Sequence, residues 1–160
     1  LEGLKLCFIG DGNNMMNSLI VGGLKTGMEV AVACPEGYRP PQEILEFAVG
    51  YGEKFTLTDD PKTAAKDADV VITDVWTSMG QEEERKAREA AFQGYCVDEA
   101  LMAVAKPDAM VQHCLPAHRG EEISADVFEA NANYIFEEAE NRLHAQKAVL
   151  VKTMGAAQEQ

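Results

Sequence analysis

Basic residues are scarce in this 160-residue sequence, where 14 lysines and arginines face 27 aspartates and glutamates and leave a formal net charge of −13. Such an acidic excess repels polyanions, which argues against a nucleic acid or an anionic membrane as the partner. Long apolar runs are also missing, because no stretch approaches the ~18 residues of a membrane span. No basic segment precedes the first short apolar run, so we expect no signal peptide. Since the sequence begins with leucine, we expect a processed or truncated chain.

Cysteines are few and widely spaced. The four are Cys7, Cys34, Cys96 and Cys114, and none of them forms a C-x-x-C pair. This spacing excludes a zinc knuckle and a thioredoxin-type redox motif. We expect reduced thiols and a cytoplasmic location. The length is that of one domain, and a chain of this size can bury roughly 68–70% of its unfolded surface without disulfides or metals.

Short apolar strands alternate with amphipathic helical stretches, a pattern typical of βαβ units. Strands are expected over residues 4–9, 29–33, 54–58, 70–73 and 110–112, and a long final helix over about 138–154. We therefore predict an α/β fold: a doubly wound, mostly parallel five-stranded sheet with helices on both faces, Rossmann-like, with the last helix packing back on the domain. Ligands of such sheets bind beyond the carboxyl ends of the strands, so the loops after the first, fourth and fifth strands are the candidate sites.

The first of these loops contains Gly10 and Gly12, which fit the start of a dinucleotide fingerprint. Met15 stands where the third glycine belongs, and the second strand does not end in the acid that would hold a ribose, so a tight turn explains both glycines better. Asn13 and Asn14 open the following helix. Their amides and the free backbone N–H groups suit a carboxylate ligand, although one asparagine could equally well only cap the helix.

The other two loops place reactive side chains at strand ends. Asp74 could bind an ammonium group or orient a catalytic partner, or it could be a capping or surface acid. Cys114 follows His113, which raises thiolate chemistry, but neighbouring strand residues face opposite sides and His113 is poorly placed to activate it. A buried structural cysteine is the alternative. Arg142 lies among glutamates on the last helix, where a surface salt bridge is the default interpretation.

Taken together, GDGNN, DVWTSMGQE, HCLPAHRGEEI and FEEAENRLHAQKAVL, in this order and spacing, resemble the ornithine carbamoyltransferases. The resemblance covers essentially the whole chain, 1–160, and corresponds to the ornithine-binding domain of that enzyme. It implies transfer of a carbamoyl group from carbamoyl phosphate to the δ-amine of L-ornithine, giving citrulline and phosphate, as in arginine biosynthesis or the urea cycle. It further implies no metal or organic cofactor and a homo-oligomer, a trimer or a multiple of one.

The resemblance assigns the ornithine site residue by residue. Asn14 matches the asparagine that binds the amino-acid end of ornithine. Asp74, Ser78 and Met79 match the acid and the S-M-G loop that close over the same ligand. We accordingly expect the segment from Asp74 to Gly80 to act as a lid over ornithine.

The resemblance also assigns the reaction centre. Cys114 matches the cysteine near the δ-amine that is assigned as proton acceptor, and a thiolate paired with Asp74 could orient the amine and ease its deprotonation. Cys114 and Leu115 match contacts to carbamoyl phosphate. Arg142 matches an arginine that holds this substrate, where a guanidinium fits developing negative charge.

The family's S-T-R-T-R loop and H-P-x-Q segment, which grip the phosphate, do not occur in this sequence. We therefore expect the carbamoyl-phosphate-binding domain to lie N-terminal to this chain and the fragment alone to be inactive. Three alternatives stay open: a free-standing ornithine-binding module without turnover, a carbamoyltransferase for a related amine, and a nucleotide-binding α/β protein.

Overall fold

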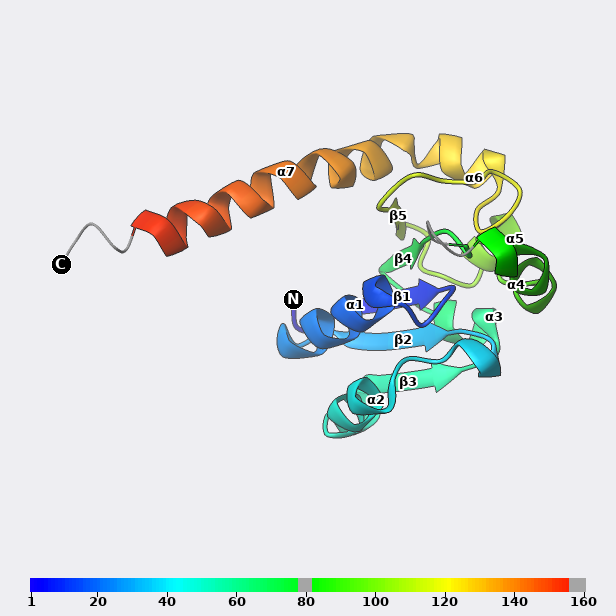
Figure 1. Cartoon of the computed structure of the whole chain (residues 1–160), viewed down its shortest axis with the longest axis horizontal. Helices are drawn as coiled ribbons and strands as arrows, with labels where there is room; N and C mark the ends of the chain where they lie inside the picture. The colour runs from blue at the N-terminus through cyan, green and yellow to red at the C-terminus, as the bar shows by residue number, and fades with distance from the viewer. Residues whose placement is uncertain (78–81, 156–160) are drawn as a thin grey trace.

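The computed structural model of the chain describes residues 1–77 and 82–155, and its centre is a parallel five-stranded sheet in the order β3-β2-β1-β4-β5 (Figure 1). The strands are β1 (Lys5–Ile9), β2 (Glu29–Ala33), β3 (Phe55–Thr58), β4 (Val70–Thr73) and β5 (Met110–His113). The α-helices are α1 (Asn14–Lys25), α2 (Gln42–Val49), α3 (Pro61–Ala65), α4 (Arg85–Ala91), α5 (Glu99–Met102), α6 (Ala125–Ala130) and α7 (Ala132–Gly155). The predicted fold class is confirmed.

Both faces of the sheet are buried because its strands are apolar on both sides, as parallel sheets require. In β1, Cys7 and Ile9 join the core on one face, whereas Leu6 and Phe8 join the core on the other. Residues of α3 and α5 pack on the first face and those of α1 on the second. The alternation fixes which way each strand end points its side chains.

The chain runs outward from β1 to β3 and then returns to form β4 and β5 on the other side of β1. The strand order therefore switches between β1 and β4, which is where open α/β sheets bind ligands. The loops after β1, β4 and β5 lie side by side at this edge.

Different structural features explain the two glycines of the first loop, Gly10 and Gly12. Gly10 has φ +146°, a backbone conformation that side chains disfavour. A Cβ on Gly12 would lie 2.4 Å from the backbone nitrogen of Pro40, and the Gly12 N–H donates to the Tyr38 carbonyl over 2.8 Å. Close packing against the backbone of residues 38–40 thus accounts for Gly12, whereas the tight-turn interpretation applies to Gly10.

The last helix differs from the prediction. It begins at Ala132, earlier than expected, and only its first part packs against the sheet beside β5, while the rest projects away from the domain (Figure 1). Ile135 is buried, whereas Val149, Leu150 and Val151 are more than half exposed. The expectation that this helix packs back on the domain is wrong for its second half, because helical periodicity reports an apolar stripe and not what covers it.

None of the helices within the described residues has both the length and the apolar character needed to cross a membrane.

Candidate functional site

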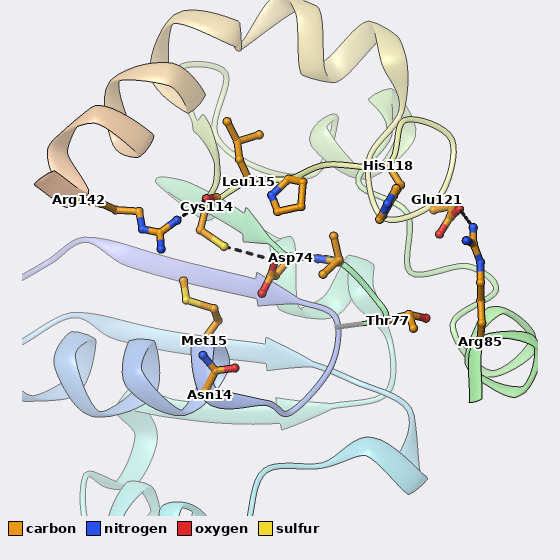
Figure 2. A pocket seen from close by; sticks show the side chains of 12 residues that line it. Asn14, Met15, Asp74, Thr77, Arg85, Cys114, Leu115, His118, Glu121 and Arg142 are labelled. Carbon is orange, nitrogen blue, oxygen red and sulfur yellow. Dashed lines mark hydrogen bonds and ion pairs between the residues drawn. The ribbon is translucent and has the colours of Figure 1, made fainter. Parts of the chain in front are cut away.

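A cavity of about 540 Å³ lies beyond the strand ends at the switch in strand order (Figure 2). Five of the residues predicted for the site line it: Asn14, Asp74, Cys114, Leu115 and Arg142. They come from the start of α1, the loops after β4 and β5, and α7. The predicted residues Ser78 and Met79 lie outside the described residues.

Asp74 and Cys114 form the centre of this cavity. The Cys114 thiol donates a hydrogen bond to Asp74 Oδ1, with 3.3 Å between sulfur and oxygen. The same oxygen accepts the backbone N–H of Val75 over 2.8 Å, which orients the carboxylate. Both side chains are buried, although both reach the cavity. Asp74 is therefore neither a helix cap nor a surface acid, and Cys114 is more than core packing.

Burial, and next the negative charge of Asp74, raise the pKa of the Cys114 thiol to about 12. Arg142 opposes this effect, but more weakly. Without substrate the group is consequently a thiol at neutral pH, because the carboxylate beside it disfavours the thiolate. The thiolate considered from the sequence is not the resting form of Cys114.

Arg142 reaches the cavity from α7. Its Nη1 donates to the Cys114 carbonyl over 2.8 Å, so this guanidinium serves the site and the surface salt-bridge interpretation is wrong. One helical turn earlier, burial raises the pKa of the Glu138 carboxyl, and the hydrogen bond from the His113 backbone, more than the charge of Arg142, partly offsets this. The cavity thus combines the Arg142 guanidinium with the buried Asp74 carboxylate, and Arg85, which is paired with Glu121, lines it as well.

The sequence left open whether the two asparagines at the start of α1 cap the helix or face a ligand. In the structure one caps the helix and the other lines the cavity. Asn13 is the N-cap, and its Oδ1 accepts the Met15 N–H over 3.0 Å. Asn14 lines the cavity instead. Its side-chain amide and the N-terminal end of α1 form a polar wall suited to a carboxylate.

Both ring nitrogens of His113 are engaged with groups other than the thiol, although one of them lies within 4.8 Å of the Cys114 sulfur, closer than strand alternation predicts. His113 Nε2 lies 3.1 Å from Oε1 of Glu122, and both side chains are fully buried. Sequence reasoning missed Glu122. A carboxylate is rarely buried completely, and nothing in the local sequence signals it.

A buried ion pair was also missed. Arg88 of α4 donates to Asp11 Oδ2 over 2.7 Å and to the Trp76 carbonyl over 3.0 Å. Its guanidinium lies 4.9 Å from the ring centre of Tyr38. Arg88 thereby ties the loop after β4 to the loop after β1, and it explains why Asp11 is buried.

Asp74, His113 and Cys114 present possible metal ligands within 4.8 Å of one another. Both His113 nitrogens are engaged, because Nδ1 accepts the Leu115 N–H and Nε2 faces Glu122. This leaves a thiol and a carboxylate for any cation, fewer protein ligands than a closed zinc site uses.

Comparison with known proteins gives a consistent result. Residues 2–153 match the protein-family model described as "Aspartate/ornithine carbamoyltransferase, Asp/Orn binding domain". Ornithine carbamoyltransferase of Methanosarcina acetivorans is 57% identical over 153 residues, which cover 96% of this chain and 51% of the relative. The enzyme of the same name from Geobacter sulfurreducens is 54% identical over 154 residues, covering 96% and 51%.

Two solved structures show the same extent of similarity. Anabolic ornithine carbamoyltransferase from Campylobacter jejuni superposes with a TM-score of 0.91 at 45% identity, covering 96% of this chain and 52% of that one. Ornithine carbamoyltransferase from Pyrococcus furiosus has a TM-score of 0.85 at 49% identity, covering 94% and 49%. The chain spans about half the length of the curated relatives it matches.

Proposed function

Because the chain belongs to the aspartate/ornithine carbamoyltransferase family, we propose that it is the ornithine-binding half of an ornithine carbamoyltransferase. The whole protein would transfer the carbamoyl group of carbamoyl phosphate to the δ-amine of L-ornithine and release citrulline and phosphate. The observation that carries this proposal is the hydrogen-bonded pair of Cys114 and Asp74 in a cavity that Asn14 and Arg142 also line.

Ornithine offers three polar groups, and the cavity has a suitable partner for each. Asn14 and the start of α1 would bind the carboxylate of ornithine, and the Asp74 carboxylate would bind one of its ammonium groups. The Cys114 thiol lies beside Asp74, where its sulfur can accept a hydrogen bond from the δ-amine. In this proposal Ser78 and Met79 complete the ornithine site.

The transfer itself forms one C–N bond and breaks one C–O bond. The δ-amine nitrogen attacks the carbonyl carbon, phosphate leaves with the electrons of the C–O bond, and the nitrogen loses a proton. Asp74 and Cys114 are the groups in reach to orient the amine and receive that proton. Arg142, with the backbone at Cys114 and Leu115, would hold carbamoyl phosphate and stabilise the charge that develops on its oxygens.

The rest of the phosphate site would come from the carbamoyl-phosphate-binding domain, which makes the two halves partners in one active site. We further propose a homo-oligomer, a trimer or a multiple of one, a cytoplasmic location and a role in arginine biosynthesis, as the family resemblance implies. No organic cofactor or metal enters this chemistry.

The test is an assay of the full-length protein with carbamoyl phosphate and ornithine, with citrulline as the readout. Asp74→Asn should raise KM for ornithine and lower kcat, while it leaves the affinity for carbamoyl phosphate nearly unchanged. Loss of carbamoyl phosphate binding in this variant would reassign Asp74 to the other substrate.

The same assay separates the alternatives. Binding of ornithine without citrulline would indicate a binding module, and faster turnover with putrescine or N-acetylornithine would indicate a related amine as substrate. Binding of NAD in place of ornithine would favour the nucleotide-binding alternative.

A further inference from the structure

His113 and Glu122 are buried ionisable residues for which the proposed chemistry has no role. Both are fully buried, and neither lines the cavity. Glu122 Oε1 lies 3.1 Å from His113 Nε2 and also accepts the His118 N–H over 2.6 Å. Since a buried carboxylate is costly without such partners, this arrangement needs a reason.

The hydrogen bonds fix the state of the imidazole. The backbone N–H of Leu115 donates to His113 Nδ1 over 2.9 Å. A backbone amide can only donate, so Nδ1 carries a lone pair, and Nε2 carries the ring hydrogen and donates it to Glu122. His113 is therefore a neutral ring held at both nitrogens.

The peptide group between Cys114 and Leu115 is held from two sides. In a trans peptide the N–H and C=O bonds point in opposite directions. His113 holds the N–H end, and Arg142 Nη1 holds the C=O end over 2.8 Å. Leu115 has φ +56°, a left-handed conformation that costs free energy for a residue with a Cβ, so this geometry depends on being held.

We infer that Glu122 and His113 are a positioning pair that fixes the Cys114–Leu115 peptide and so places the Cys114 thiol and the Arg142 guanidinium for catalysis. Glu122 orients His113, and His113 acts on the peptide through its Nδ1. Neither residue exchanges a proton with the thiol, because both ring nitrogens are already engaged elsewhere. This inference rests on the proposed carbamoyl transfer.

The rival role is a proton relay in which Glu122 and His113 withdraw the thiol proton, and isosteric variants of the full-length protein separate the two. Glu122→Gln keeps a buried acceptor for His113 Nε2 and removes the charge. Positioning predicts a loss of kcat/KM below about tenfold, whereas removal of the carboxylate from a true relay costs about 10⁴-fold.

His113→Gln and His113→Asn test the roles of the two ring nitrogens separately. The asparagine amide oxygen can replace Nδ1 as the acceptor for Leu115, whereas glutamine reaches only toward Glu122. We expect His113→Gln to lose about 10²-fold in kcat/KM, the scale of a misplaced reactive group, and His113→Asn to recover most of it. Glu129→Gln, an exposed change in the next helix, is the matched control and should leave the kinetics unchanged.

A second readout needs no turnover: the rate at which iodoacetamide alkylates Cys114, relative to Cys96 in the same protein. Positioning predicts faster alkylation in His113→Gln, because the thiol is released from Asp74, whereas loss of a relay base would slow it.

A 10⁴-fold loss of kcat/KM in Glu122→Gln, equal losses of kcat/KM in both His113 variants, or slower alkylation in His113→Gln would each overturn the inference. If His113→Gln does not fold, Glu122→Gln and His113→Asn decide it. Absence of citrulline with the unmodified protein would refute the proposed function, and the alkylation rates would still test the positioning.

Discussion

At the scale of single residues, the reactivity of Cys114 is set by its two neighbours. Burial and, next, the Asp74 carboxylate disfavour the thiolate, while Arg142 favours it only weakly. A substrate ammonium placed beside Asp74 would neutralise the charge that holds the thiol protonated. The cysteine would therefore become a better proton acceptor only when ornithine is bound.

The pH dependence of Cys114 alkylation tests this view. In the substrate-free protein the rate should rise with pH and show no plateau below about 12, because the thiolate is the reacting form. Asp74→Asn should increase the rate at any fixed pH, since it removes the neighbouring charge. Cys96, whose pKa burial raises to about 11, is the internal control and should not respond to this substitution. A plateau near pH 8 would show that the resting group is already a thiolate.

Two cysteine substitutions in the full-length protein distinguish chemistry from packing. Cys114→Ala should lower kcat by about 10²–10⁴, the usual range for loss of an acid–base group. Cys7→Ala is the matched control, because Cys7 is fully buried in β1 and lines no cavity wall near Asp74. We expect Cys7→Ala to reduce the free energy of unfolding by about 1 kcal/mol or more and to leave kcat nearly unchanged. Similar kinetic losses in both variants would contradict the assignment.

The sequence predicts some of these residues and not others for a physical reason. Asp74 and Cys114 follow apolar strands, so the topology rule places them at one edge, and the family resemblance gives them roles. No local sequence pattern predicts that Glu122 and Asp11 are buried. Each acid is buried because it pairs with a residue elsewhere in the chain, His113 or Arg88, and the pairing depends on tertiary structure.

At the scale of elements, Arg88 connects α4 to the strand ends. The guanidinium and the Asp11 carboxylate are both largely buried, with side-chain exposures of 8% and 10%. Burial is the main cause that raises the pKa of Asp11, and the bond to Arg88 opposes it. Each of the two buried charges therefore needs the opposite charge of its partner to offset the cost of burial.

Arg88→Met should reduce the free energy of unfolding by about 3–5 kcal/mol, the cost of leaving a buried charge unpaired. The loss should shrink at low pH: a carboxyl with a raised folded-state pKa contributes stability below its unfolded pKa and loses it as pH rises through the folded value. Denaturant unfolding at pH 4.5 and 7 measures both effects. Arg85→Met is the control, because the Arg85 pairs with Glu89 and Glu121 are exposed and should contribute less than about 1 kcal/mol. Equal losses at the two sites would contradict the argument.

The predicted strands and helices agree best with the structure where the local sequence determines their ends. All five strands agree with the prediction to within one residue at each end, and Asp60, whose side chain accepts the N–H groups of Lys62 and Thr63, is the N-cap of α3. The described part of the segment between β4 and α5 is less regular than a single helix, since a short 3-10 turn (Glu82–Glu84) precedes α4. The split between α6 and α7 was missed because propensity does not locate a break that Asn131 makes.

At the scale of the whole molecule, charge and length argue for an incomplete site. Carbamoyl phosphate is an anion, yet one of the two arginines that line the cavity, Arg85, is paired with Glu121. The net charge of −13 also opposes anion binding.

The 160-residue chain alone should therefore produce no measurable citrulline, and the full-length protein should produce it readily. Mixing the chain with a separately produced N-terminal half should restore part of the activity if the two halves share one active site. Steady turnover by the chain alone, in a preparation checked by mass spectrometry for full-length protein, would contradict this prediction.

The projecting half of α7 leads to the last prediction. Isolated helical turns are marginal in water, and most helices owe their stability to packing of an apolar face. In α7 that face includes Leu150, Val151 and Met154, all more than half exposed. The proposed N-terminal half of the protein is the natural cover for these side chains.

Amide hydrogen exchange measures this directly. In the 160-residue chain, amides over 146–154 should exchange at close to their intrinsic rates, while the amide of Ile135, which is buried beside the core, stays protected. In the full-length protein the same nine amides should be protected by at least about a hundredfold, because covering the apolar face stabilises the helix there. Leu150→Glu should abolish this gain in the full-length protein and hardly alter the melting temperature of the chain alone, since it removes a contact that only the longer protein has. Glu140→Gln, an exposed change on the same helix, should affect neither. Equal protection of 146–154 in both proteins would show that this half of α7 is stable without a partner.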